Sequence, residues 1–383
     1  MKAIINAHIL GETEITKGTI LFEDGKIINI GNEADIEIPA TAQVIDANGK
    51  YVTAGFIDAH THLGIDEEGV RWEGQDYNET TSAVTPHLRA LDGIYPYDGG
   101  FNDAVAAGVT TAQVLPGSAN VIGGLTVCIK IRLGKSVDEM ILREPSGLKI
   151  ALGENPKSAH GNNGRAPKTR MAVAAILREQ FSKAKHYMEK KKKGENVFDF
   201  ELEALQLALE RKIPVRAHAH RADDIMTVIR IAKEFDLDLS VEHTTEGHQI
   251  AHLLAESGAK FTVGPTISSR SKVELRDKGW QTYKALEEAN VPFAITTDHP
   301  VIPIQYLQTS VNLAVKEGLS EQTALNSVTK YAADVLGIQD QTGTLEIGKD
   351  ADIVIWDAHP LRQNSYAWVT FVDGEIVYQK EEK

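Results

Sequence analysis

"GFIDAHTHLG", residues 55–64, ends an apolar run with two histidines one residue apart, and an aspartate lies two residues before the first of them. In a β-strand, residues i and i+2 point to the same side. The imidazoles of His60 and His62 should therefore share one face at the point where a buried strand ends. This spacing suits two ligands of one metal ion.

The central part of the chain alternates short apolar runs with helical patterns. Residues 223–235 show helical spacing, with Ile225, Val228, Ile229 and Ala232 on one face, and a second helix is predicted from Ser320 to just before Gly337. Eight strands in such an alternation predict an α/β fold of the (β/α)8 TIM barrel type, with catalytic groups at the C-terminal ends of the strands. The third candidate strand can equally be part of a hairpin. The candidate strands are "GFIDAHTH", "GVTTAQVL", "LTVCIKIR", "GLKIALG", "IPVRAH", "LDLSVEH", "KFTVGP" and "PFAITTD".

The two ends of the chain have a different pattern, in which short strands are separated by turn pairs. Asp24-Gly25, Asn48-Gly49 and Asp373-Gly374 are typical of hairpin turns. We therefore expect residues 1–54 and 343–383 to form one composite β-sandwich domain, and residues 55–342 to form the catalytic barrel.

Composition excludes several classes of function. The net charge of −14 disfavours nucleic acid and anionic membrane surfaces as partners, and the basic run at residues 190–193 is interpreted as the solvated end of a helix. No apolar run approaches the length of about 18 residues that a membrane span needs. The single cysteine, Cys128, lies in an apolar stretch and is expected to be a buried structural thiol. A cytoplasmic protein is predicted.

Polar residues also end three other candidate strands. His218 ends "PVRAH", His243 ends "LDLSVEH" and Asp298 ends "PFAITTD". Each has an ordinary explanation alone, as a satisfied polar side chain or a turn residue. Together with the histidine pair they would bring four imidazoles and a carboxylate to one mouth of a barrel, which is a ligand set for zinc or a similar divalent ion.

Six segments of the chain resemble the amidohydrolase superfamily, and they are nearest to its imidazolonepropionase-like and prolidase-like branch. The resemblance covers nearly the whole chain and implies a metal-dependent barrel hydrolase with a composite β-sandwich. The segments that carry it are "AGFIDAHTHLG" (54–64), "AAGVTTAQVLPG" (106–117), "VRAHAH" (215–220), "VEHTTEG" (241–247), "TTDHP" (296–300) and "TGTLEIGKDADIVIWD" (342–357).

The resemblance implies a role for each strand-end residue. His60 and His62 match the first metal pair, His218 and His243 match the fifth-strand and sixth-strand ligands, and Asp298 matches the residue that touches the metal and transfers protons. The implied reaction is hydrolysis of an amide, cyclic amide or peptide C–N bond by metal-activated water. Zinc is the first expectation, with one or two ions per chain; manganese, cobalt and iron also fit.

A bridging ligand between two metals has two candidates. Lys149 could serve as a carbamate formed with CO₂, as in many relatives, and Glu154 could serve as a carboxylate. Regular alternation would put these two side chains on opposite sides of a strand, unless the strand breaks at Gly153. We favour Lys149, because a long side chain suits a position deeper in the strand.

Several groups are candidates for substrate contacts. His220 lies on the same face as His218 if the strand continues, and could polarise a substrate carbonyl. The following glycine-rich and asparagine-rich loop carries a cluster that predicts at least one contact to an anion, consistent with a small substrate that bears a carboxylate. The cluster comprises Lys157, His160, Arg165 and Arg170.

Two other functions remain open from sequence. A metal-dependent deaminase would share the barrel and the ligands, and would be recognised by ammonia release. A noncatalytic scaffold would be expected to lack ligands, whereas this chain has every one of them. Sequence also leaves a homo-oligomer open.

Overall fold

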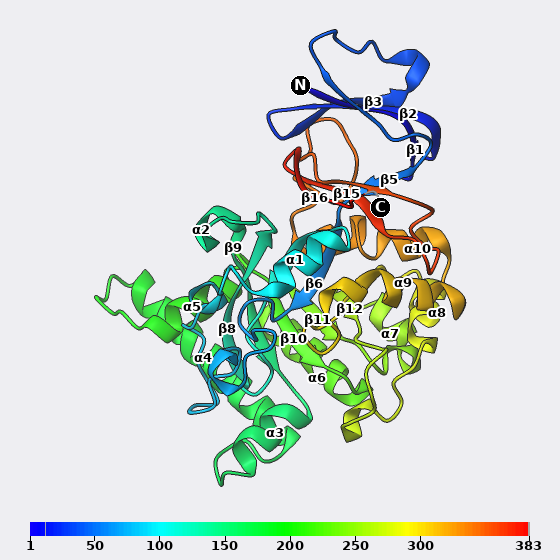
Figure 1. The fold of residues 1–383 in the computed structure, drawn as a ribbon. Helices are drawn as coiled ribbons and strands as arrows, with labels where there is room; N and C mark the ends of the chain where they lie inside the picture. Colours follow the sequence, from blue (N-terminus) through cyan, green and yellow to red (C-terminus); the bar gives the residue numbers. More distant parts are fainter. Residues whose placement is uncertain (12, 382–383) are drawn as a thin grey trace.

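The computed structural model describes residues 1–11 and 13–381. Figure 1 shows a barrel and, at one end of it, a separate sheet in which the first and last strands, blue and red, lie together. The coarse prediction is confirmed: the fold is mixed α/β and contains a nearly closed barrel sheet of eight strands.

All eight predicted strands occur, and they are neighbours in the barrel in chain order. Strand β8 pairs antiparallel with both of its neighbours, so one end of the sheet contains a hairpin and not a βα unit. The other pairings are parallel. The strands are β6 (Phe56–Thr61), β7 (Val109–Val114), β8 (Ile122–Lys130), β9 (Ile141–Ala151), β10 (Val215–Ala219), β11 (Leu239–His243), β12 (Lys260–Val263) and β13 (Ala294–Ile295).

The barrel closes between β6 and the residues that follow β13. The amide of Asp298 donates to the carbonyl of His60 at 3.1 Å, and the amide of His62 donates to the carbonyl of His299 at 2.8 Å. Below these bonds, the buried carboxylate of Asp58 accepts from the Thr296 hydroxyl at 2.6 Å. This seam holds the ends of the first and last barrel strands against each other.

Helices cover the outside of the barrel, as expected for parallel strands. The helix predicted at residues 223–235 is α6, and its four predicted core residues are buried. The basic run at 190–193 ends the long helix α4, as predicted. The helices are α1 (Gly99–Ala106), α2 (Val137–Met140), α3 (Glu154–Gly161), α4 (Arg170–Lys192), α5 (Phe200–Leu209), α6 (Ala222–Phe235), α7 (Ala251–Ala255), α8 (Gln281–Glu288), α9 (Leu307–Lys316), α10 (Glu321–Asn326) and α11 (Lys330–Leu336).

The single helix predicted after Ser320 is wrong in one respect, because it is two helices, α10 and α11. Ser320 caps α10 by accepting from the amide of Thr323, and Gly337 ends α11 with φ +68. Between them, the hydroxyls of Ser327 and Thr329 donate to the carbonyls of Ala324 and Leu325, which ends one helix before the next begins.

Both chain ends contribute to a second sheet of eight strands. Two of the predicted turns join antiparallel strands, β2 to β3 and β15 to β16, but Asn48-Gly49 joins β4 to β5, which both pair in parallel with β1. The strand pairing defines a single sheet, whereas a β-sandwich needs two packed sheets. The β-sandwich and the domain boundaries therefore stay predictions. The strands are β1 (Lys2–Ile9), β2 (Ile15–Glu23), β3 (Lys26–Asn32), β4 (Gln43–Asp46), β5 (Tyr51–Ala54), β14 (Ile353–Trp356), β15 (Ala367–Val372) and β16 (Glu375–Gln379).

The apolar residues form one large core around the barrel and a separate core on the terminal sheet. Cys128 is buried, as predicted, and burial raises the pKa of its thiol. Among the described residues, no helix is both long and apolar enough to cross a membrane.

Candidate metal centre

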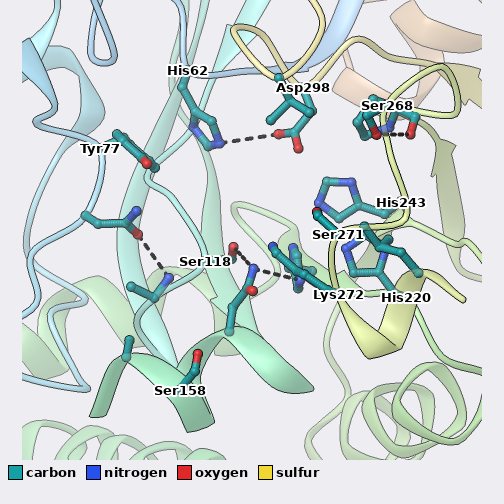
Figure 2. A pocket seen from close by; sticks show the side chains of 18 of the residues that line it. His62, Tyr77, Ser118, Ser158, His220, His243, Ser268, Ser271, Lys272 and Asp298 are labelled. Carbon is teal, nitrogen blue, oxygen red and sulfur yellow. Dashed lines mark hydrogen bonds and ion pairs between the residues drawn. The ribbon is translucent and has the colours of Figure 1, made fainter. Parts of the chain in front are cut away.

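A cavity of about 800 Å³ opens at the C-terminal ends of the barrel strands. Figure 2 shows side chains from several of these strands and from the loops after them pointing into it. The residues that line its inner wall include every one of the four predicted ligand histidines, together with His220, Lys149 and Asp298. The cavity therefore lies where sequence predicted the catalytic groups.

His60 and His62 lie at the end of β6, and each imidazole is held through its Nδ1 atom. The Nδ1 of His60 lies 3.1 Å from Oε2 of the buried Glu242, and the Nδ1 of His62 lies 2.7 Å from the carbonyl oxygen of Leu115. Both Nε2 atoms face Oδ1 of Asp298, at 3.4 Å and 3.3 Å. These two nitrogens therefore lie beside that carboxylate, where all three atoms could bind one cation.

His218, His220 and His243 form a second group on β10 and β11. The rings of His218 and His243 are 4.5 Å apart, and the Nδ1 of His243 lies 2.9 Å from the carbonyl oxygen of Gly264. One nitrogen from each of the three rings lies within 4.8 Å of the others. A second such group combines His60, His243 and Asp298. The site thus offers two overlapping positions for a cation.

Two of these residues reach the site through left-handed backbone. His243 has φ +75 and Asp298 has φ +55. Alternation along β11 would put Glu242 and His243 on opposite faces, yet both side chains lie beside His60. Non-glycine residues adopt such backbone rarely and at some cost in strain, which persists where the surrounding structure holds it, as at active sites.

The electrostatics of the cluster favour metal binding. Burial lowers the pKa of His243 to about 3 and holds the pKa values of His60 and His218 well below the ordinary range. Burial alone would raise the pKa of Asp298, but the neighbouring imidazoles of His243, His62 and His60 outweigh it and lower the pKa. At neutral pH the imidazoles of His60, His218 and His243 are therefore neutral and Asp298 is ionised, which are the forms that bind a divalent ion.

Lys149 points into this cluster from β9. Its side chain is 1% exposed, and its Nζ lies 3.3 Å from Nε2 of His60. Burial lowers the pKa of this amine to about 8. The structure does not bring Glu154 to the imidazoles, because Glu154 begins α3 and its Oε2 accepts from the amide of Glu274 at 3.2 Å. Of the two candidate bridges, only Lys149 reaches the site.

None of the four residues in the cluster that was predicted to hold at least one anion contact lines the cavity. Arg170 pairs with Asp224 at 3.0 Å, and Arg165 donates to the carbonyls of Thr80 and Thr81. His160 and Lys157 both belong to α3, where His160 is buried and Lys157 is half-buried. The same loop instead contributes uncharged polar groups to the wall: Asn155, Ser158, Asn162 and Asn163.

Sequence reasoning missed three groups at the site. Lys272 lines the cavity from the loop after β12, Glu242 holds His60, and Glu274 faces His218 and His220. Glu242 immediately precedes a predicted ligand, which is a usable signal. Lys272 and Glu274 follow a strand end by several residues within a polar loop, and nothing local distinguishes them.

Unpaired buried atoms show that the site suits a metal. Within residues 1–11 and 13–381, Nδ1 of His218 and Oδ1 of Asp298 are buried without a hydrogen bond of good geometry. Such atoms are costly to bury unless something binds them. Histidine nitrogens and carboxylate oxygens are the usual ligands of zinc and similar ions.

The comparisons with known proteins identify the class. The profile of the amidohydrolase family matches residues 51–377, and the chain belongs to this family. Membership of this family confirms the prediction of a metal-dependent hydrolase that acts on C–N bonds.

Individual relatives agree with the family. The chain is similar to a solved amidohydrolase from Thermotoga maritima MSB8, with 40% identity, a TM-score of 0.96 and coverage of 99% of this chain and 100% of that one. It is 26% identical to an imidazolonepropionase of Rhizorhabdus wittichii, over 90% of this chain and 88% of that protein. It is also 29% identical to amidohydrolase tasK of Hapsidospora irregularis, over 93% of this chain but only 39% of that longer protein.

Proposed function

We propose that this amidohydrolase cleaves an amide, cyclic amide or peptide C–N bond in a small substrate that carries a carboxylate, and that zinc is its first candidate metal, with one or two ions per chain. The observation that carries the proposal is the convergence of histidines from β6, β10 and β11 with Lys149 and Asp298 on one cavity wall. A scaffold without chemistry would have no need for this set.

The proposed ligands fall into two groups. His60, His62 and Asp298 would hold one cation, and His218 and His243 would hold a second. Lys149, as a carbamate, is the candidate bridge, since an ammonium would repel both ions whereas a carbamate is anionic. When bound, a divalent ion lowers the pKa of water and can polarise a carbonyl.

Asp298 is proposed to move protons. Its carboxylate lies on the cavity wall with 16% of the side chain exposed, so it is reachable by water and substrate. As an ionised acceptor it can take a proton from the attacking water and return it to the leaving nitrogen, and proton transfer of this kind contributes about 10²–10⁴-fold to rate.

His220 is proposed to bind the substrate carbonyl. Its Nδ1 lies 2.7 Å from the Thr245 hydroxyl. If that hydroxyl donates to Nδ1, the ring carries its proton on Nε2, which lies 3.8 Å from Oε1 of Glu274. Because His220 lines the cavity, this N–H is the proposed donor to a developing oxyanion.

Lys272 is the proposed contact for the substrate's carboxylate. It lines the cavity, and among the described residues its ammonium has no hydrogen bond or ion pair. Ser268, Ser269 and Ser271 of the same loop also line the cavity, and they add hydroxyl groups that can bind the other oxygen of a carboxylate.

Metal analysis combined with a substrate panel tests the proposal. We expect at least one tightly held divalent ion per chain, complete loss of turnover on chelation, and recovery with Zn²⁺, Mn²⁺ or Co²⁺. Acyl-proline dipeptides and cyclic imides should be hydrolysed, and purines, pyrimidines and guanidines should release no ammonia. Full turnover by protein shown to be free of metal would refute the mechanism, and ammonia release would establish the deaminase alternative.

A further inference from the structure

Glu274 is a buried carboxylate at the metal centre that no part of the proposed mechanism uses. It lies in the turn Val273–Leu275, after β12, and is 1% exposed. Its Oε1 lies 3.6 Å from Nε2 of His218 and 3.8 Å from Nε2 of His220. In the described part of the chain, this Oε1 has no hydrogen bond.

The position of Glu274 is fixed by contacts to the loop after β9. Its Oε2 accepts from the amide of Glu154 at 2.8 Å, and Oε2 of Glu154 accepts from the amide of Glu274 at 3.2 Å. Gly153 leaves room for this exchange, because a Cβ there would lie 2.6 Å from Oε2 of Glu274, and its φ of +82 also favours glycine. One oxygen is therefore anchored, which directs the other oxygen at the imidazoles.

The ligand histidines differ in which nitrogen is held. His60, His62 and His243 each place Nδ1 beside a fixed oxygen, of Glu242, Leu115 and Gly264. A neutral imidazole has one N–H and one lone pair, so an acceptor at Nδ1 leaves the lone pair on Nε2.

His218 has the opposite arrangement. Its Nδ1 is buried and unpaired, and its Nε2 faces Oε1 of Glu274. An ionised carboxylate can only accept, so it favours the tautomer with the proton on Nε2 and the lone pair on Nδ1.

Asn155 is the other polar neighbour of this nitrogen. Its amide nitrogen is placed 3.4 Å from Nε2 of His218 and 2.7 Å from the Ser118 hydroxyl. The two ends of an amide are assigned from the hydrogen bonds around them. Turned by half a rotation, the amide oxygen would accept from both Ser118 and His218, in agreement with the tautomer that Glu274 favours.

We infer that Glu274 is a positioning residue that keeps the proton of His218 on Nε2, so that Nδ1 is the metal-binding atom of this one histidine. The inference rests on the proposed function for its metal, but the tautomer itself is a property of the metal-free protein. Partners of this kind orient metal-binding histidines, and their loss costs about 10–100-fold in metal affinity.

Glu274→Gln provides the sharpest variant. The amide oxygen can still accept from the Glu154 amide, and its NH₂ then faces His218 as a donor, which reverses the preferred tautomer at nearly equal volume. We expect Co²⁺, titrated into metal-free protein and followed by its visible absorption, to bind about 10–100-fold more weakly at one position. Glu274→Asp, which keeps an acceptor, should recover part of this affinity.

Glu154→Gln is the matched control, because it alters the partner in the same loop contact without touching an imidazole. We expect its Co²⁺ affinity to equal that of wild type. Equal weakening in both variants would assign the effect to the loop contact and overturn the inference, as would a Glu274→Gln affinity within twofold of wild type.

The ¹⁵N shifts of His218 in metal-free wild-type protein test the tautomer without any variant. A proton on Nε2 supports the inference, and a proton on Nδ1 overturns it. Wild-type protein that binds no divalent ion at all would refute the proposed function, whatever tautomer His218 adopts, so the two failures are distinguishable.

Discussion

Lys130 and Lys149 are buried on neighbouring strands of the same barrel sheet, but they lie at opposite ends of it and have opposite surroundings. Lys130, at the base of the barrel, contacts three carboxylates that lie next to strands of the terminal sheet. They belong to Asp350 and Asp352, just before β14, and to Asp373, just after β15. Lys149, at the mouth, has the imidazole of His60 as its hydrogen-bond neighbour.

The surroundings move the two pKa values in opposite directions. Burial alone would lower the pKa of Lys130, but Asp352 and Asp373, with a hydrogen bond to Asp350, outweigh it and raise the pKa. At Lys149 burial prevails, and the pKa falls to about 8. A buried lysine that is paired with carboxylates joins two parts of a fold, whereas one that has only an imidazole as its neighbour is available for chemistry. The site around Lys149 also holds buried atoms without a hydrogen bond.

The largest expected effect is at the mouth. Asp298→Asn keeps the size of the side chain but removes its ability to take a proton, so kcat should fall by about 10²–10⁴-fold. Thermal melting should stay close to wild type and much of the metal should remain bound, so a larger loss of turnover than of metal would assign the effect to the chemical step. Turnover near the wild-type level would remove Asp298 from the proposed role.

At the base of the barrel, replacing the buried Lys130 should lower the stability of the protein and leave its chemistry unchanged. Lys130→Met removes the cation that three carboxylates share; Asp350 and Asp373 keep Lys26 and Arg132 as partners, but the buried Asp352 loses its cation. Breaking a buried ion pair costs about 3–5 kcal/mol in the free energy of unfolding. Denaturant unfolding measures this loss, and the folded fraction should keep its turnover. Lys135→Met, at the exposed Lys135–Glu139 pair, is the control and should change stability little.

The raised pKa of Lys130 also predicts a dependence on pH. A lysine whose folded pKa is raised contributes stability that is fully present below its ordinary pKa of about 10.4 and is lost as the pH rises through the folded value. Wild-type protein should therefore lose stability in this alkaline range more steeply than Lys130→Met. Parallel curves would contradict the assignment.

Lys149→Ala tests the other lysine. If the side chain is a carbamate between two cations, metal content should fall from about two ions per chain towards one, and bicarbonate should promote reassembly of the wild type but not of the variant. Elemental analysis gives the count. A wild type with one ion, unchanged in the variant, would show that the site is mononuclear.

The smallest expected effect concerns a third lysine, at the rim. Lys272→Met should raise KM for a carboxylate-bearing substrate by about tenfold, the scale of one charge-assisted hydrogen bond, with a smaller change in kcat. The amidated form of the same substrate should bind both proteins equally. Arg165→Met, outside the cavity, is the control, and a rise in KM there instead would restore the original prediction for the loop.

Much of the fold was predictable because it depends on local pattern. Short apolar runs between helical patterns located all eight barrel strands, and helical spacing located α6 with its buried face. The break between α10 and α11 was missed because it depends on hydroxyl groups that bond to the helix backbone, which periodicity does not register. The hairpin of β8 and β9 was open from sequence, since an apolar strand reads the same in either direction.

The residues of the candidate site also fall into those that sequence could locate and those that it could not. The strand-end histidines and Asp298 could be located because each directly follows an apolar run. The anion contacts could not, because four cationic or imidazole side chains in one loop are equally plausible in sequence. In the structure, Arg170 is occupied by Asp224, and Lys272 of a different loop lines the cavity.

By itself, the sequence determined the barrel strands and the paired facing of His60 and His62, since these follow from residue spacing along one strand at a time. It also indicated the family, through the motifs that resemble it along nearly the whole chain. Tertiary structure decided which lysine or glutamate reaches the imidazoles, that left-handed backbone brings His243 and Asp298 to the site, and that Glu274 meets His218. The physical reason is that these contacts join strands and loops far apart in the chain, and only closure of the barrel sets the distances between them.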